Sequence, residues 1–402
     1  MVILTEPFAS PNLVMWLSQS GHPVLNNDYA RIQNEGLADM GYATLNLVEA
    51  GQAVARLEAG ERLYTSAENA LEWVEQRVSN PVLTAGIRAC KDKEVFRQAL
   101  ASVGDALFFK TYDVSELSRV DPAQLPLPVV LKPVVGFCSV GVYVIKNAQD
   151  WTQAVSYIEE RTDQWTQLYP QSVVGSKRFI VEQMIGGQEF AVDMFYDQEG
   201  RAHILNLFQH DFSSPEDTKD RLYWTSVELL RRYGNEFARW LDHANQALGL
   251  RDFCVHVELR RTEEGTIVPI EFNPLRFAGL GGTDLAWYGY GFITVEEYLT
   301  GNQGITADSE VDDFLSAMGI ALDSTNTYSM SVLELPADRG LDVSFDFDAL
   351  NQNLTGLLAT YMFDPKVHGA LGFVFKKSTP QTIQELEYLR DLDIAPFIRD
   401  AE

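Results

Sequence analysis

Short apolar runs alternate with amphipathic segments over the first 90 residues of the chain. The runs that predict strands are VILTE (2–6), PVLNND (23–28), ATLNLV (43–48) and PVLTAG (81–86). SPNLVMWLSQSG (10–21) predicts a helix that Ser10 caps and Gly21 ends, and ENALEWVEQRV (68–78) predicts another. Strands that alternate with helices are typical of a small parallel α/β domain.

The middle of the chain changes to hairpins and longer helices. KDKEVFRQALASVG (91–104) predicts an amphipathic helix, and residues 127–147 predict two strands joined by a glycine-bearing turn. Residues 178–212 predict three strands, and residues 253–273 predict a hairpin about the turn Glu-Glu-Gly. Helices are expected at 147–165 and 226–250, and the tail from about Thr327 returns to strands before a last helix at 379–392.

The chain is too long for one typical core, so several domains are expected. We expect an N-terminal α/β domain at 1–90, a small lobe at 91–180, a large lobe at 181–325 and a smaller C-terminal lobe at 326–402. The resulting fold class is a multidomain combination of α/β and α+β structure.

Composition narrows the possible partners of the protein. The 402 residues carry 57 acidic and 31 basic side chains, a formal net charge of −26, which argues against binding to nucleic acid or to an anionic membrane. Three cysteines do not build a disulfide framework, and no run approaches the roughly 18 apolar residues of a membrane span. The N-terminus lacks the basic region of a signal peptide, so we expect a soluble cytoplasmic protein, with a homodimer as a reasonable assumption.

Polar side chains gather on the hairpin at 253–273. His256, Glu258 and Arg260 share one face of its first strand, and Glu271 and Asn273 share a face of its second. Two carboxylates and an amide oxygen are the hard ligands that Mg²⁺ prefers. The alternative is a solvent-facing polar strand side with a cross-strand ion pair.

A second group surrounds the glycine-bearing turn. Lys132 ends an apolar strand, and Gly136, Ser139 and Gly141 follow in a loop whose backbone N–H groups could hold phosphates. The alternative is an ordinary flexible hairpin. Cys138 in this loop has no histidine near it in the sequence and is interpreted as incidental.

A third group follows the strand at 178–182. The backbone of Glu182, Gln183, Met184 and Ile185 could pair with the edge of a purine, and Glu189, after two glycines, could accept from ribose hydroxyls. The alternative is simply a strand, a turn and an acidic residue. His210 is expected to be a solvated loop histidine, although a place in an active-site flap is possible.

The order and spacing of DKEVFRQAL, VLKP with its glycine-rich hairpin, VEQMIGGQEF and HVELRRTEEGTIVPIEFNP resemble the ATP-grasp family over roughly residues 85–300. The resemblance implies ATP clamped between two lobes, with Mg²⁺ (or Mn²⁺) as the metal. The family roles carried over to this chain are phosphate contacts for Lys93 and Lys132, a mobile phosphate lid for Gly136 to Gly141, an adenine hinge for Glu182, Gln183, Met184 and Ile185, a ribose contact for Glu189, metal ligation for Glu258, Glu271 and Asn273, and a place near the transferred phosphate for His256.

Arg276 is the expected anchor for a substrate carboxylate or the acylphosphate, with Arg260 as an alternative. Amino-acid-ligating members of the family read Asn-Pro-Arg, whereas this chain reads Asn-Pro-Leu-Arg at 273–276. The resemblance implies an ADP-forming ligase that joins a small-molecule acid to an amine through an acylphosphate. Carboxylation, phosphotransfer and non-catalytic nucleotide binding are the alternatives.

Overall fold

The computed structural model describes residues 1–104, 107–136, 141–168, 177–213, 221–301, 303–336, 339–368 and 370–400. Its N-terminal part is a parallel four-stranded sheet in the order β3-β2-β1-β4, which confirms the expected parallel α/β unit. The elements are β1 (Val2–Ile3), α1 (Pro11–Ser20), β2 (Pro23–Leu25), α2 (Asp28–Asp39), β3 (Asn46–Val48), α3 (Ala50–Glu58), β4 (Tyr64–Thr65) and α4 (Leu71–Arg77). As expected, the Ser10 side chain caps α1, and Gly21 ends it with a φ of 65°.

The expected strand at 81–86 is wrong, because these residues begin helix α5 (Pro81–Lys91). The Asn80 side chain accepts hydrogen bonds from the backbone N–H groups of Val82 and Leu83 and so caps the helix. A short apolar run cannot distinguish a strand from the buried face of a helix. The helix expected at 91–104 begins instead at Lys93, because Asp92 caps a separate helix α6 (Lys93–Ala101).

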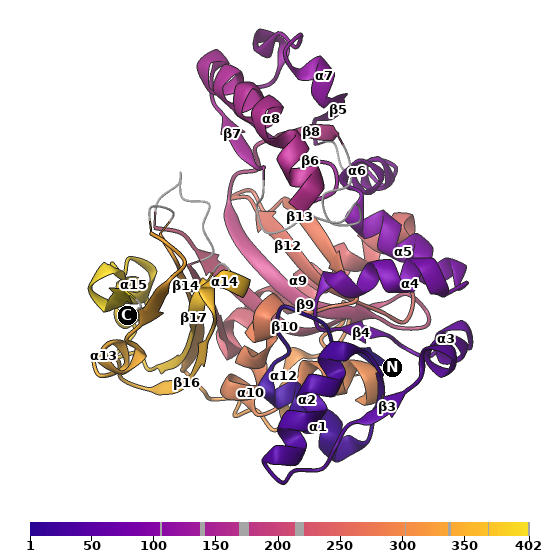
Figure 1. The fold of residues 1–402 in the computed structure, drawn as a ribbon, viewed down its shortest axis with the longest axis vertical. Helices are drawn as coiled ribbons and strands as arrows, with labels where there is room; N and C mark the ends of the chain where they lie inside the picture. The colour runs from indigo at the N-terminus through magenta and orange to yellow at the C-terminus, as the bar shows by residue number, and fades with distance from the viewer. Residues whose placement is uncertain are drawn as a thin grey trace.

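The small lobe, at the top of Figure 1, is an antiparallel sheet in the order β5-β8-β6-β7 with helix α8 packed against it. Its elements are β5 (Phe109–Asp113), α7 (Val114–Leu117), β6 (Val129–Pro133), β7 (Tyr143–Ile145), α8 (Ala148–Leu168) and β8 (Arg178–Gln183). Trp151 and Ile158 of α8 and Phe179 of β8 are buried in its core. The expected strand–turn–strand at 127–147 is confirmed, since β6 pairs with β7.

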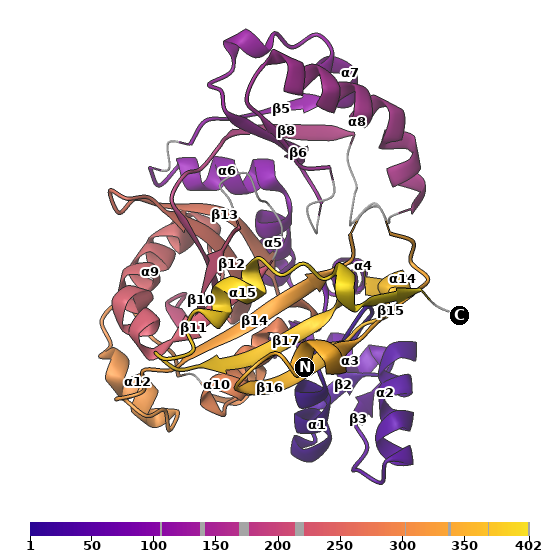
Figure 2. The ribbon, with the colours of Figure 1, turned by 90° about the vertical axis from the view of Figure 1, so that its left-hand side faces the viewer.

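The large sheet has eight antiparallel strands in the order β13-β12-β9-β10-β11-β14-β17-β16. The strands are β9 (Gln188–Tyr196), β10 (Ala202–Asp211), β11 (Leu222–Ser226), β12 (Phe253–Arg261), β13 (Ile267–Pro274), β14 (Thr327–Glu334), β16 (Leu357–Met362) and β17 (Ala370–Ser378). Figure 2 shows the strands after residue 326 continuing the same sheet. A separate two-stranded sheet pairs β15 (Val343–Phe345) with β18 (Ile398–Asp400).

Helices cover the large sheet and connect its strands. The longest is α9 (Val227–Leu248), which Ser226 caps and which buries an apolar stripe that includes Leu230, Phe237 and Leu241. The others are α10 (Leu285–Tyr290), α11 (Thr294–Glu296), α12 (Val311–Ala317), α13 (Phe347–Asn351), α14 (Pro365–His368) and α15 (Glu385–Arg390). No helix in the described part of the chain combines the length and apolar character needed to cross a membrane.

Candidate active site

Strands β12 and β13 bring the expected metal ligands together. Glu258 lies opposite Glu271, and His256 lies opposite Asn273, in antiparallel register. Asn273 Nδ2 lies 3.4 Å from Glu258 Oε1, and His256 Nε2 lies 3.8 Å from the same oxygen. Directly opposed residues project from the same face of a sheet. The hairpin therefore concentrates two carboxylates, an amide and an imidazole on one face, as the sequence predicts.

The chemistry of this set fits Mg²⁺ or Mn²⁺. Carboxylate and amide oxygens are hard donors, and Mg²⁺ usually takes only one or two protein carboxylates together with water and substrate phosphates. Within the described ranges, no group of three or more His, Cys, Asp or Glu side chains could enclose a metal by itself. Glu258, Glu271 and Asn273 thus suit an ion that shares its ligands with a nucleotide.

Cations adjoin this acidic face. Lys93 Nζ lies 3.3 Å from Glu271 Oε2, so the first residue of α6 faces the hairpin. Lys132 Nζ lies 2.6 Å from Glu182 Oε2, and Arg97 Nε lies 2.6 Å from Glu182 Oε1. Lys93 and Lys132 both lower the pKa of Glu271, although burial of that carboxyl opposes them. Both lysines expected at the phosphates therefore lie within electrostatic range of a proposed metal ligand.

Glu182 is a buried counter-charge for two cations. Its side chain is 3% exposed, and burial alone would raise its pKa, but the charges of Lys132 and Arg97 prevail and lower that pKa to about 2. The carboxylate orients both cations, and the group of three keeps one positive charge. Sequence reasoning found Glu182 but gave it a backbone role, and it missed Arg97, which lies 85 residues away along the chain.

The hinge segment, residues 182–185 at the end of β8, is fixed by several hydrogen bonds. The Gln183 N–H donates to Phe108 O at 3.0 Å, and the Met184 N–H donates to Pro128 O at 3.1 Å. The carbonyl of Ile185 accepts from Arg260 Nη1 at 2.7 Å. The backbone between the two lobes is therefore fixed on both sides.

Glu189 has two partners on the large sheet. Its Oε1 lies 2.9 Å from His210 Nδ1, and its Oε2 lies 2.9 Å from Arg260 Nε. Burial would raise the pKa of Glu189, but His210 and Arg260 lower it. The expectation of a solvated loop for His210 is wrong, because His210 belongs to β10 and is 1% exposed. Arg260 accordingly lies beside Glu189 and the hinge backbone.

His256 is oriented by an aspartate that the sequence did not indicate. Asp193 on β9 is fully buried, and its Oδ1 lies 2.7 Å from His256 Nδ1 and accepts from the Ala278 N–H at 2.9 Å. Its Oδ2 is buried and has no hydrogen-bond partner within the described residues. The pair fixes the imidazole so that Nε2 faces Glu258. Its only sequence signal was a lone acidic residue in an apolar strand.

The additional residue before Arg276 adopts an uncommon backbone conformation. Leu275 is fully buried and has a φ of 58°, in the left-handed region that side chains other than glycine seldom adopt. Its carbonyl accepts from the Thr65 N–H of β4 at 2.7 Å. Burial would lower the pKa of Arg276, but Glu68, Glu258 and Glu271 raise it. Arg276 is therefore turned toward the N-terminal domain, and it still lies within electrostatic range of the proposed metal ligands Glu258 and Glu271.

The glycine-rich loop is only partly described. Gly136 follows β6, Gly141 has a φ of 76° before β7, and Ser139 lies outside the described residues. The glycines after Arg276 lie in the 3₁₀ segment Gly279–Asp284, where Gly281 has a φ of 77°.

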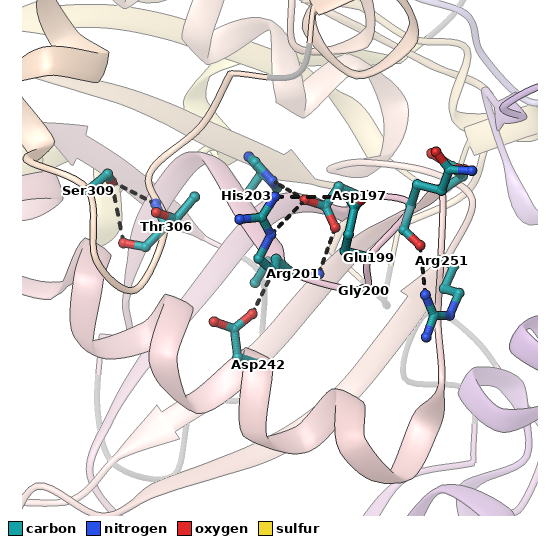
Figure 3. A network of polar contacts seen from close by, with 12 residues as sticks. Asp197, Glu199, Gly200, Arg201, His203, Asp242, Arg251, Thr306 and Ser309 are labelled. Carbon is teal, nitrogen blue, oxygen red and sulfur yellow. Dashed lines mark hydrogen bonds and ion pairs between the residues drawn. The ribbon is translucent and has the colours of Figure 1, made fainter.

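A second Asp–His pair lies just beyond the other end of β9, in the network that Figure 3 shows. His203 Nε2 lies 2.9 Å from Asp197 Oδ2, and the other Asp197 oxygen accepts from the Arg201 N–H at 2.8 Å. The Arg201 guanidinium also approaches Asp197, at 3.2 Å. Asp197 and Arg201 belong to the connection between β9 and β10, and His203 is the second residue of β10, so this network supports a turn.

Comparison with known proteins identifies the fold class. Residues 125–284 match the family model of the ATP-grasp domain. Among solved structures, an L-amino acid ligase from Bacillus licheniformis is similar over 99% of this chain and 97% of its own, with 17% identity and a TM-score of 0.69. An N5-carboxyaminoimidazole synthase from Aspergillus clavatus, in complex with ADP and 5-aminoimidazole ribonucleotide, is similar over 97% of this chain and 98% of its own, with 16% identity and a TM-score of 0.61.

Two further comparisons extend this picture. A biotin carboxylase from Campylobacter jejuni is similar over 96% of this chain and 90% of its own, with 12% identity and a TM-score of 0.56. An uncharacterized protein, y4rH, from Sinorhizobium fredii is 27% identical over 201 residues, which are 48% of this chain and 37% of that protein. The chain thus matches little more than a third of this relative's length. Residues 125–284 thus match an ATP-grasp domain, and the chain as a whole shares the fold of these solved structures.

Proposed function

We propose that the protein is an ATP- and Mg²⁺-dependent ligase that activates a small carboxylic acid and transfers its acyl group to an amine. The observation that carries this proposal is the opposed pair Glu258 and Glu271, completed by Asn273 and adjoined by Lys93. This donor set and cation arrangement suit a metal–triphosphate group. The similar structure named as an L-amino acid ligase, and the synthase structure that contains ADP, support the same interpretation.

The residues have distinct proposed roles. Glu258, Glu271 and Asn273 would hold the metal, which supplies charge neutralisation at the phosphates. Lys93 and Lys132 would contact phosphate oxygens, with Glu182 keeping Lys132 extended toward them. Backbone groups of 182–185 other than the Gln183 N–H, the Met184 N–H and the Ile185 carbonyl, which have partners within the protein, would recognise adenine.

The reaction needs positioning more than covalent chemistry from the protein. Phosphoryl transfer to a carboxylate depends on aligned groups and neutralised charge, and the resulting acylphosphate must be kept from water. His256, with Nδ1 held by Asp193, would offer Nε2 to the transferred group. Arg276 would anchor the acid or its acylphosphate. Arg260 is the weaker candidate for that role, because its partners are Glu189 and the Ile185 carbonyl at the hinge, whereas Arg276 lies within electrostatic range of Glu258 and Glu271.

The test is a matrix of carboxylic acids against amines, scored by ADP release and by product mass. A ligase releases ADP only when both substrates are present and yields a product heavier than the acid. Bicarbonate-dependent ADP release with a carboxylated product would replace ligation by carboxylation, and a phosphorylated final product would replace it by phosphotransfer. ADP binding without turnover in any mixture would identify a nucleotide-binding module.

A further inference from the structure

Glu68, in the N-terminal domain, contacts the residue proposed to anchor the substrate. Its Oε1 lies 3.0 Å from Arg276 Nε and 2.9 Å from Arg276 Nη2, and its Oε2 pairs with Lys91. The side chain of Glu68 is only 11% exposed. Burial would raise the pKa of Glu68, but Lys91 and Arg276 lower it to about 2. One buried carboxylate therefore joins the N-terminal domain, the end of α5 and the loop after β13.

This ion cluster adjoins the proposed metal site. Lys91 precedes Lys93 by two residues, and Lys93 pairs with Glu271 at 3.3 Å. The carbonyl of Leu275 is bonded to Thr65, three residues before Glu68, so the loop that carries Arg276 is attached to the same segment. The left-handed turn at Leu275 and the Glu68 carboxylate together determine where the displaced arginine can lie.

We propose that Glu68 is a positioning residue for the acyl-transfer site: it holds Arg276 and Lys91 in place and keeps both cations away from the metal-binding carboxylates. This inference rests on the proposed function. If Glu68 lost its charge, two buried cations would lack their carboxylate. For Arg276 the next carboxylates in range are Glu258 and Glu271, and Glu271 is also in range of Lys91. Pairing of these cations with Glu258 or Glu271 would compete with the metal.

The chain offers a matched control for a purely structural role. Arg62 Nε lies 2.8 Å from Asp252 Oδ1, and Arg62 Nη1 donates to Tyr298 O at 2.6 Å. This ion pair also joins the N-terminal domain to the large sheet, but it lies at the far end of β12 from Glu258. Asp252→Asn therefore removes an interdomain ion pair without touching the site.

The experiment measures Mn²⁺ binding in the presence of ADP by electron paramagnetic resonance, for the wild type, Glu68→Gln, Glu68→Asp and Asp252→Asn. We expect Glu68→Gln to weaken Mn²⁺ binding roughly tenfold, Glu68→Asp to retain part of the affinity because it keeps the charge, and Asp252→Asn to match the wild type. Thermal unfolding of each variant reports the structural effect separately.

Equal Mn²⁺ affinity in Glu68→Gln and the wild type would overturn the proposal, whatever the change in thermal stability. A Glu68→Gln protein that does not fold leaves Glu68→Asp to decide, because the shorter carboxylate must still weaken Mn²⁺ binding measurably. A wild type that binds Mn²⁺ and ADP but releases no ADP with any acid and amine would contradict the ligase function alone. Loss of Mn²⁺ affinity in Asp252→Asn as large as that in Glu68→Gln would show that domain contact, not positioning, controls the site.

Discussion

Strand β9 and the turn after it carry two Asp–His pairs that differ in what surrounds them. Asp197 and His203 are six residues apart, and a neighbouring arginine completes the contacts of the aspartate (Figure 3). Asp193 pairs with His256, 63 residues away, and also accepts from the backbone of Ala278. The first pair closes a turn, whereas the second connects three segments that meet at the acidic face of β12 and β13.

The two aspartates also differ in how completely they are satisfied. Both oxygens of Asp197 accept hydrogen bonds, and the unpaired atom in that network is His203 Nδ1. In the other network the unpaired buried atom is Asp193 Oδ2, an oxygen of an acidic side chain. An unpaired carboxylate oxygen is costly to bury, and such costs are tolerated mainly at functional sites. The contrast indicates that the Asp197–His203 pair serves stability and the Asp193–His256 pair serves the site.

The largest expected effect comes from removing a proposed metal ligand. Glu271→Ala deletes one of two opposed carboxylates, so we expect substrate-dependent ADP release to fall at least about 10³-fold. Asp197→Asn, the matched change in the turn, should leave the rate within about twofold. Steady-state ADP assays on both proteins make the measurement. Comparable losses in the two variants would contradict the division between site and turn.

The hairpin that holds Glu271 could be predicted from the sequence because neighbouring residues alone determine its strands and turn. Alternation along each strand and the turn Glu-Glu-Gly determine which side chains share a face, and the register confirms Glu258 opposite Glu271. The parallel N-terminal sheet followed in the same way from alternating patterns. The prediction of a strand for PVLTAG (81–86) was wrong because an apolar run of six residues fits either a strand or the buried turns of α5.

The residues that support the site could not be predicted, because their partners are remote in sequence. Glu68 meets Arg276 across 208 residues, and Asp193 meets Ala278 across 85. No periodicity or spacing rule encodes such pairs. His210 was misplaced for a related reason: a polar sequence suggested a loop, but Glu189 pairs with Nδ1 of the imidazole inside the sheet.

The second prediction concerns Glu182, a site carboxylate whose role is electrostatic. Its folded pKa of about 2 lies below its ordinary value of 4.5, so its stabilising effect is complete above pH 4.5 and is lost as pH falls toward 2. A difference of that size corresponds to about 3 kcal/mol at neutral pH. Glu182→Gln should therefore unfold more easily at pH 7 and show a flatter stability curve between pH 4.5 and 2. Urea unfolding across this range measures both, and an unchanged acid slope would contradict the assignment.

The third prediction compares the two Asp–His pairs directly. Asp193→Asn removes the charge that orients His256, so we expect ADP release to fall roughly 10- to 100-fold. Asp197→Asn should instead lower the free energy of unfolding by about 1–2 kcal/mol with little change in rate. Paired measurement of rate and urea unfolding tests both statements. If Asp193→Asn changed only stability, the interpretation of its unpaired oxygen as a mark of the site would be wrong.

The smallest expected effect concerns Asp284, a buried carboxylate whose described partners are neutral. It accepts from Asn12 Nδ2 at 2.8 Å and from the Tyr361 hydroxyl, and burial raises its pKa to about 6. A raised acid pKa means that the folded state binds the proton more tightly, so this group favours folding below pH 4 and loses that contribution as pH rises through 6.

Asp284→Asn should remove this pH-dependent loss of stability, and it should therefore stabilise the protein by about 1–2 kcal/mol at pH 8, but not at pH 4. Thermal unfolding at both pH values measures the difference, and Asp197→Asn, whose wild-type carboxylate has a lowered pKa, should show the opposite sign at pH 8. If both variants were destabilised at pH 8, the carboxylate of Asp284 would stabilise the fold in the same way as that of Asp197, and the prediction would be wrong.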